Sequence, residues 1–489
     1  MKTMHFIFLF GWMATVFAQE IALAPDQMKA DLAVVRDILT NGHPGLYDYT
    51  SKTQLDSLYR SIVTEISTPQ SPAAFFRLLS GLTDQIHDGH LLLFPPPTLQ
   101  KVERFFPLLL KYIQGDWYTD TDDFDLPAGT QILSINDIPL DEILERLWKY
   151  VPADGFNTTQ KYRKIEMYFS LYLNYAFGAA LDYSVTYLDQ NGQTQRRTVQ
   201  SEPFESLNTR NTRRRSYFAR YHGFEDGRNF SARYIGNKSP FVYFIDSLKT
   251  AVLTVHSFGI DPKQFKSDLI DLFEEIEDAE ADYLVIDIRR NDGGFRPDAI
   301  HLFTFLTNKP FRQIESSQVV SLTIPQQEYV FKTYLDPQQF LYDKFKDYPR
   351  GDRWVLATDG AEEIMVPDDR GFKGKVYVLV GGLTFSAAAT FALNAKNDPD
   401  ITLVGEECGG GYYFHNGEFP VYYRLPHSEI VLVQFMEKVL HVVSDKTVPP
   451  GSGVPPDYTV GLTADDLFTG KDAQLDYILN QLIPLSSTH

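Results

Sequence analysis

The sequence contains one cysteine, Cys408, among 489 residues. A single cysteine excludes an intramolecular disulfide and any zinc site built from several cysteines. Cys408 stands in the turn EECGGG (406–411) with no neighbouring base, which indicates a passive residue rather than a nucleophile. The patterns C-x-x-C, H-E-x-x-H and GxxxxGK[ST] are also absent, so the commonest zinc, redox and nucleotide-binding motifs are excluded.

Positive charge is scarce. The chain has 45 Lys and Arg against 64 Asp and Glu, a formal net charge of −19. Such a chain repels a phosphate backbone, so we expect no nucleic-acid partner. The one dense basic stretch, 210–220, is short and is interpreted as a solvated loop. With 43% hydrophobic and 22% charged residues the composition is that of a globular protein, and the length suggests two to four domains.

Long hydrophobic runs are missing except near the amino terminus. The apolar run 6–18 follows Lys2 and is shorter than the roughly 20 residues that span a bilayer. The basic start, the short apolar stretch and the small residues Val16 and Ala18 predict a signal peptide over 1–18, cut after Ala18. The alternative is a buried first helix. We therefore expect an exported protein, periplasmic or extracellular, with no stable membrane insertion.

The first half of the mature chain divides into three predicted regions. Residues 24–94 form a helical segment, in which Met28, Leu32, Val35 and Leu39 share one helix face and a second helix covers 73–86. Residues 100–200 form a mostly β module, which includes a hairpin of strands 183–189 and 195–200. Residues 201–245 show little periodicity and are predicted to be a linker or insertion.

Residues 246–489 are predicted to be a domain of class α/β. Apolar strands over 251–256, 283–288, 375–380 and 401–405 alternate with helical stretches, of which 262–279 has one clear apolar face. The near-continuous apolar character of 283–288 is typical of a buried parallel strand. This order predicts βαβ units with the chemistry at the carboxyl ends of the strands.

Two loops follow such strands. The first, RRNDGGF (289–295), has adjacent glycines that allow the backbone to turn its amide N–H groups toward an oxyanion. Its simpler interpretation is an ordinary strand-to-helix turn. The second, GGLTFS (381–386), leads into a helix whose dipole favours negative charge on Ser386. There the Ala387 amide is a candidate oxyanion donor, and the simpler interpretation is that Ser386 only caps the helix.

Four stretches, 283–294, 381–389, 404–411 and 453–460, resemble the serine peptidases of family S41, the tail-specific, C-terminal-processing and tricorn-like group, in the family's order. The resemblance implies a ClpP/crotonase-like core. Residues 126–139 look like a degenerate PDZ-like module within 100–200, and Asp88-Gly89-His90 resembles the family's amino-terminal part.

The resemblance also implies roles for single residues. Ser386 matches the nucleophile, and Gly293 and Ala387 match the oxyanion donors, with Gly294 as a substitute for Gly293. The lysine base of the bacterial processing branch has no counterpart, since its place is taken by GGYY (410–413). His90 matches the histidine that the tricorn branch uses, and a neutral imidazole suits a serine hydroxyl at neutral pH.

His415 is the alternative base, because it lies near the expected lysine position. No acidic third residue is identified from the sequence. The implied function is an exported serine endopeptidase that acts on peptides or proteins through an acyl-enzyme, with no metal or organic cofactor. Two alternatives stay open: a non-catalytic binder of hydrophobic ligands or peptides, similar to the interphotoreceptor retinoid-binding proteins, and a serine esterase. The oligomeric state is left open.

Overall fold

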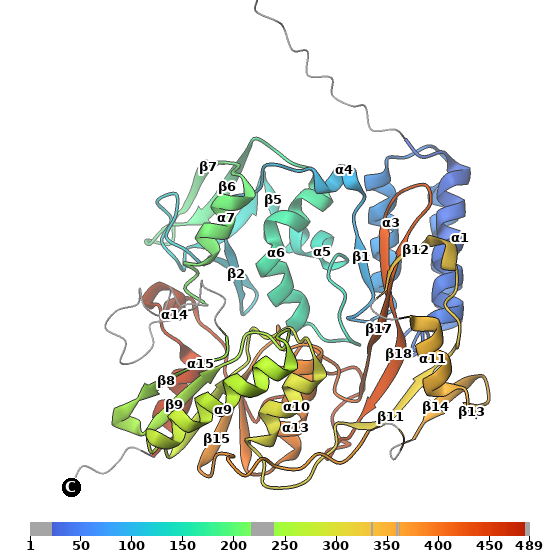
Figure 1. Cartoon of the computed structure of the whole chain (residues 1–489). Helices are drawn as coiled ribbons and strands as arrows, with labels where there is room; N and C mark the ends of the chain where they lie inside the picture. The colour runs from blue at the N-terminus through green and yellow to red at the C-terminus, as the bar shows by residue number, and fades with distance from the viewer. Residues whose placement is uncertain (1–21, 217–238, 334–335, 358–359, 361, 485–489) are drawn as a thin grey trace, which may run out of the picture.

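The computed structural model describes residues 22–216, 239–333, 336–357, 360 and 362–484. The predicted signal peptide, 1–18, lies outside the described residues. Figure 1 shows amino-terminal helices beside a long hairpin, a β-rich module next to them, and a helix-covered sheet below both. The fold is α/β, as the sequence predicts.

The amino-terminal segment is helical, as predicted. It consists of α1 (Pro25–Gly42), α2 (Lys52–Glu65) and α3 (Pro72–Asp84). The four residues expected on one face of the first helix, Met28, Leu32, Val35 and Leu39, are all buried. The Ser71 side chain accepts a hydrogen bond from the Ala74 amide and so caps α3. The turn after α3 then carries residues 87–90 toward β1 (Leu92–Phe94).

The second region is an antiparallel sheet packed against two helices. Its strands, in the order β2-β3-β4-β6-β7 with β5 on β4, are β2 (Leu110–Ile113), β3 (Asp116–Thr119), β4 (Gln131–Ile135), β5 (Ile138–Pro139), β6 (Asp182–Leu188) and β7 (Thr194–Gln200). The predicted hairpin is the β6–β7 pair. Its helices are α5 (Leu140–Trp148) and the long α6 (Thr159–Phe177). Of these two, only α6 is not predicted by the sequence pattern.

The central sheet of the carboxyl-terminal part is parallel except at one edge, where β8 pairs antiparallel with β9. Its order is β19-β16-β15-β10-β9-β8, with β8 (Phe241–Ile245), β9 (Thr250–Thr254), β10 (Tyr283–Asp287), β15 (Lys375–Val380), β16 (Ile401–Gly405) and β19 (Tyr458–Thr459). The helices α9 (Pro262–Asp278), α10 (Arg296–Thr304) and α13 (Ala387–Asn397) share its main apolar core. The predicted βαβ order is confirmed.

A third sheet joins the two ends of the chain. Its order is β12-β17-β18-β11-β14-β13, with β1 on β18, and its strands are β11 (Ile314–Val319), β12 (Val330–Thr333), β13 (Pro349–Arg350), β14 (Arg353–Leu356), β17 (Phe414–Arg424) and β18 (Val431–His441). Leu92 of β1 faces Val433 of β18. One apolar core contains residues of the amino-terminal helices and of β17 and β18. This packing brings the turn after α3 to the carboxyl-terminal part.

Regular elements also occur in the range 201–245, for which the sequence predicts a linker. They are α7 (Phe204–Asn211) and the edge strand β8; residues 217–238 lie outside the described part. The remaining helices are α4 (Pro97–Gln100), α11 (Pro337–Phe345), α14 (Ala464–Thr469), α15 (Ala473–Tyr477) and short turns over Asp246–Leu248, Gln327–Tyr329 and Ile478–Leu482.

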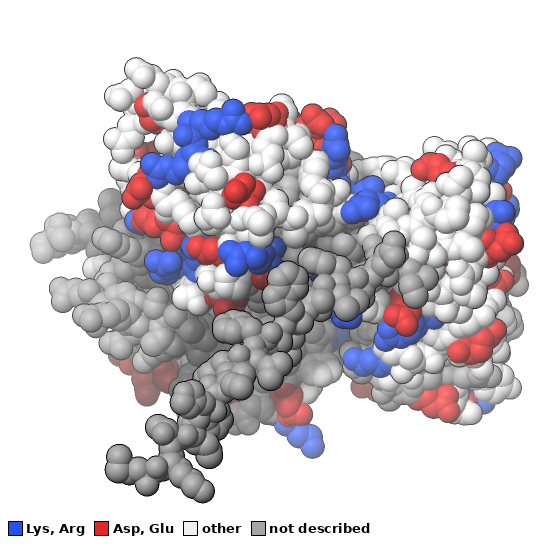
Figure 2. Space-filling model, turned by 90° about the horizontal axis from the view of Figure 1, so that it is seen from above, with Lys and Arg blue, Asp and Glu red and all other residues white. Residues whose placement is uncertain are grey.

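Charges of both signs are interspersed on the face seen in Figure 2, where basic and acidic side chains alternate over the coloured surface. Across the residues that the structure describes, no helix combines the length and the apolar character that crossing a bilayer requires.

Candidate active site

Ser386 lies between β15 and α13 in a strained backbone conformation. Its φ is +52° and its ψ is −128°, a combination that a non-glycine residue adopts only when the surrounding structure enforces it, and such strain is common at active sites. Although Ser386 occupies the N-cap position, its side chain makes no capping hydrogen bond. Its Oγ lies 3.1 Å from Nε2 of His90 instead. The interpretation as a simple helix cap is therefore wrong.

His90 reaches Ser386 from the turn that follows α3. Its ring stacks on Phe385, with 4.5 Å between the ring centroids. Burial lowers the pKa of His90 to about 4, against the opposing charge of Asp88. The imidazole is therefore neutral at neutral pH. Its Nδ1 is buried and has no hydrogen-bond partner among the described residues.

Asp88 is the nearest charged neighbour of this imidazole. Its Oδ1 accepts the backbone N–H of His90, and its Oδ2 lies 2.8 Å from Nε2 of His43. Because Nδ1 of His43 accepts the Gly45 amide, the His43 proton is on Nε2 and is donated to Asp88. Burial alone would raise the pKa of Asp88, but the His43 hydrogen bond and the nearby histidines hold it below its usual value. Asp88 is thus an ionised group beside His90.

Asp154 is a second buried carboxyl in the same cluster. Its Oδ1 accepts the Gly89 amide at 2.7 Å and its Oδ2 accepts the Gly411 amide at 3.0 Å. Burial, together with the charge of Asp88, raises the pKa of Asp154 to about 7. Ligand atoms of Asp88, His90 and Asp154 all lie within 4.8 Å of one another, a spacing that suits a metal ion. However, all four carboxylate oxygens already accept hydrogen bonds, which favours a hydrogen-bonded cluster.

The two loops that the sequence singles out meet at Ser386. Gly293 has φ of +106°, and a Cβ on it would lie 2.7 Å from Cβ of Ser386, so only glycine fits there. Its N–H, however, donates to Oδ1 of Asn291 at 3.0 Å, which occupies it in this state. Ala387 is the first residue of α13, so its amide has no acceptor within the helix. The Ala387 amide is therefore available to donate to an oxyanion, whereas the Gly293 amide must first break its hydrogen bond to Asn291.

His415, the alternative base, lies on β17 next to His90, with 5.5 Å between the ring centroids. Its Nδ1 is 2.7 Å from Nε2 of His441, whose own Nδ1 is 3.0 Å from the Tyr412 carbonyl. A carbonyl only accepts, so His441 carries its proton on Nδ1 and accepts from Nδ1 of His415. Burial lowers the pKa of His415 well below its usual value. His415 is a neutral neighbour of the pair and makes no hydrogen bond to Ser386.

A lysine that the sequence analysis does not single out also lies here. Nζ of Lys164, on α6, is 5.5 Å from the centroid of the Phe385 ring, the same ring that stacks on His90. Burial lowers the pKa of Lys164, and the charge of Asp292 opposes that shift. The charge of Lys164 in turn lowers the pKa of His90. Lys164 is thus a basic group beside the reacting pair.

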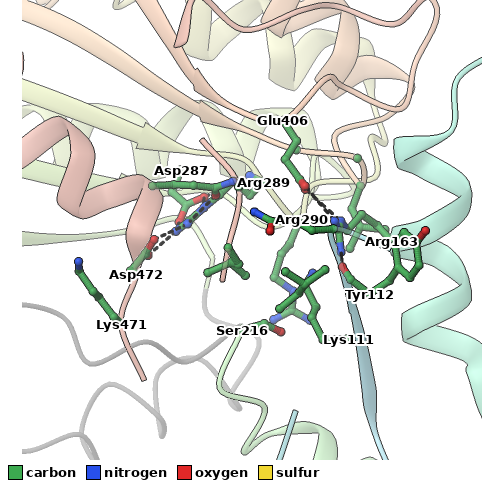
Figure 3. Close-up of a pocket in the computed structure, with 18 of the residues that line it drawn as sticks. Lys111, Tyr112, Arg163, Ser216, Asp287, Arg289, Arg290, Glu406, Lys471 and Asp472 are labelled. Atoms are coloured by element: carbon green, nitrogen blue, oxygen red, sulfur yellow. Dashed lines mark hydrogen bonds and ion pairs between the residues drawn. The ribbon is translucent and has the colours of Figure 1, made fainter. Parts of the chain in front are cut away.

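A cavity of about 150 Å³ lies at the carboxyl ends of β10 and β15, and residues of β2 and α6 also line it. Figure 3 shows that ion pairs form its walls. Arg289 binds both Asp287 and Asp472, and Arg163 binds Glu406 at 2.9 Å. Ser386 and His90 do not line this cavity. Its ion pairs hold Arg289 in the loop before Gly293 and join α6 of the second region to the loop after β16.

Cys408 is fully buried, and burial raises the pKa of its thiol. It therefore stays protonated at neutral pH, as expected of a passive residue.

The residues that the sequence analysis does not identify, Asp154, Lys164 and His43, come from three separate segments. None of them stands in a motif, so only the folded chain brings them together. Asp88 carries one signal, its place two residues before His90.

Comparisons with known proteins relate part of the chain to a peptidase family and nearly the whole chain to several solved structures. Residues 249–460 match the family model described as Peptidase family S41. No curated protein matches the chain. Mature CPAF complexed with lactacystin is similar at 15% identity and a TM-score of 0.64, over 93% of this chain and 98% of that one. A mutant CPAF structure gives 14% identity and a TM-score of 0.65, over 94% and 96%. The photosystem II D1 C-terminal processing protease gives 13% identity and a TM-score of 0.41, over 91% and 98%.

Proposed function

Residues 249–460 belong to peptidase family S41, and from that premise we propose that this chain is an exported serine endopeptidase that cleaves peptide bonds through an acyl-enzyme on Ser386. The observation that carries the proposal is the 3.1 Å separation between Oγ of Ser386 and Nε2 of His90. It falls within the range over which a general base takes a proton from a hydroxyl. The strained Ser386 backbone and its unused capping position support the same role.

In the proposed reaction His90 takes the Ser386 proton while Oγ attacks the peptide carbonyl. A C–O bond forms, and the oxyanion is held by the Ala387 amide and by the Gly293 amide once it leaves Asn291. Each good donor contributes roughly 3–4 kcal/mol to transition-state stabilisation. His90 then gives its proton to the leaving nitrogen, and the C–N bond breaks. Water hydrolyses the ester with His90 again as base.

Asp88 has a supporting role in this proposal. Protonated His90 is an imidazolium in a buried site, and a nearby negative charge stabilises it. Asp88 supplies that charge and is itself fixed by His43. Asp88 acts through the electrostatic attraction of its charge and not through a hydrogen bond to Nδ1 of His90.

The test is covalent labelling with a fluorophosphonate, followed by peptide hydrolysis. We expect the wild-type protein to be labelled at Ser386, and Ser386→Ala to lose both labelling and turnover by about a thousandfold or more. Ser61→Ala, an exposed serine on α2, is the control and should behave as wild type. A folded wild-type protein without labelling would favour the non-catalytic binder. Hydrolysis of a matched ester without the peptide would favour the esterase.

Export is the second part of the proposal and rests on the pattern of residues 1–18. Mass spectrometry of the protein recovered from its native host should find Gln19 as the first residue. Retention of residues 1–18 in the mature protein would contradict it.

A further inference from the structure

Lys164 differs from the other cations of its helix. Within the first half of α6, Lys161 forms an ion pair with Asp84, and Arg163 forms one with Glu406. In the described part of the chain, Nζ of Lys164 has neither a hydrogen-bond acceptor nor a carboxylate within ion-pair distance. A half-buried ammonium without a hydrogen-bond acceptor or a paired carboxylate is costly, because it loses hydration and gains only the contact with the Phe385 ring. Something that binds at this place would remove that cost.

The position of this ammonium relates it to the reacting groups. It lies against the ring of Phe385, the residue before Ser386, and that ring stacks on His90. The charge of Asp292, the residue before Gly293, also acts on Lys164 and opposes the lowering of its pKa. Lys164 therefore lies beside the nucleophile loop and within the electrostatic influence of the oxyanion loop.

We propose that Lys164 is a subsite for a carboxylate of the peptide, either an acidic side chain or a free carboxyl terminus close to the scissile bond. The inference rests on the proposed peptidase function. The anionic groups of an unmodified peptide are carboxylates, and an ammonium in a partly dehydrated site forms a strong charge-assisted hydrogen bond with them. Such a bond is worth about a 10- to 100-fold preference.

Three peptides of one sequence test the proposal and distinguish the two sources. One carries a glutamate and an amidated terminus, one a glutamine and a free terminus, and one a glutamine and an amidated terminus, with the glutamate moved through the positions around the cleaved bond. We expect kcat/KM for one of the first two to exceed the third by about 10- to 100-fold. Lys164→Gln should reduce this ratio toward one, and Lys164→Arg should retain it.

Reversing the charge at position 164 separates a role in substrate recognition from a structural role. Lys164→Glu should favour a peptide with lysine in place of the glutamate, a swap that a purely structural role of Lys164 does not produce. Lys52→Gln, an exposed lysine on α2, is the control and should keep the wild-type ratio. A wild-type enzyme that cleaves all three peptides equally, or a preference that survives Lys164→Gln, would overturn the proposal.

Binding separates this proposal from the peptidase function itself. The same three peptides are titrated against full-length Ser386→Ala and against the double variant with Lys164→Gln. If neither wild type nor any variant cleaves peptides but Ser386→Ala binds the carboxylate peptide in a Lys164-dependent way, the peptidase function fails and the subsite stands. Equal binding of all three peptides refutes the subsite.

Discussion

At the scale of single residues, the site depends on what surrounds one imidazole. His90 is covered by Phe385 on one ring face, faces Ser386 through Nε2, and has Asp88 and Lys164 as opposing charges. Burial is the largest of these influences and favours the neutral ring. The site is therefore prepared to accept a proton, and the Asp88 charge limits how weak a base His90 becomes.

The pH dependence of turnover follows from that balance. A protonated His90 cannot act as base, so activity is lost as pH falls through its pKa, which burial lowers to about 4. We expect the acid limb of the kcat/KM profile near pH 4 rather than near 6.5. Asp88→Asn removes a charge that favours the imidazolium, so its acid limb should move to lower pH and its turnover should fall by about 10- to 1000-fold. An acid limb at 6.5 in both proteins would contradict this assignment.

Gly417 provides a steric test of the same ring. A Cβ on Gly417 would lie 2.8 Å from Nε2 of His90 and 2.6 Å from Cδ2 of His415, so the rings must move. We expect Gly417→Ala to lower kcat/KM about 100-fold, because misplacing a base by about 1 Å has that effect. The matched control is Gly81→Ala in α3, where nothing lies within 4 Å of the new Cβ and stability should rise by about 0.5–1 kcal/mol. Labelling of Gly417→Ala at the wild-type rate would refute the placement of His90.

At the scale of helices and strands, the sequence pattern predicts two kinds of element correctly: those that bury one face, and those that are buried almost completely. α1 has one apolar stripe, and β10 and β15 are almost wholly apolar, so each is predicted correctly. α6 is missed because its aromatic residues lie on several faces and because Tyr168 interrupts the helical backbone. The β17–β18 hairpin is missed because a bulge between His415 and Glu418 breaks the alternation.

Some residues of the candidate site are predictable from the sequence and others are not. Ser386 and His90 stand in motifs, so a family resemblance identifies them. Asp154 and Lys164 come from the connection before α6 and from α6 itself, and neither has a local pattern. Their positions follow from how α6 packs against the two loops, which is tertiary information.

A substitution of Asp154 tests whether its hydrogen bonds to two loops contribute to stability. It connects the turn after α3 with the loop after β16 through two backbone amides, and an asparagine can accept only one of them. We expect Asp154→Asn to lower the free energy of unfolding by about 1–3 kcal/mol at pH 5.

The pH dependence of that loss has a definite sign. The pKa of Asp154 is raised to about 7 in the folded state, so the stability due to its neutral form is present below pH 4 and is lost as pH rises through 7. The difference in thermal midpoint between wild type and Asp154→Asn should therefore narrow from pH 5 to pH 8. A difference that widens would contradict the assigned direction.

At the scale of the whole molecule, the amino-terminal helices and the carboxyl-terminal hairpin share one core. Ile38 of α1 is fully buried in the cluster that includes Leu432 and Met436 of β18. β1 adds a strand to the same sheet and fixes the turn that holds His90. The predicted helical segment 24–94 is thus built into the carboxyl-terminal part of the fold.

Ile38→Ala tests this shared core. We expect a loss of about 2–5 kcal/mol, in one unfolding transition that lowers the thermal midpoint of both ends of the chain together. Hydrogen exchange followed by mass spectrometry reports the two ends separately. Val63→Ala, 44% exposed on α2, is the control and should change stability by less than about 0.5 kcal/mol. Early melting of α1–α3 with β17 and β18 still protected would contradict a common core.

The reacting pair is separated by 296 positions along the chain. A ribosome therefore releases the imidazole long before it adds the hydroxyl, and β18, which anchors the histidine turn, is synthesised later still. A fragment that ends before Ser386 lacks the hydroxyl, and a fragment that ends before β18 lacks the strand that pairs with β1 after the histidine turn. The proposed hydrolytic activity therefore requires a nearly complete chain.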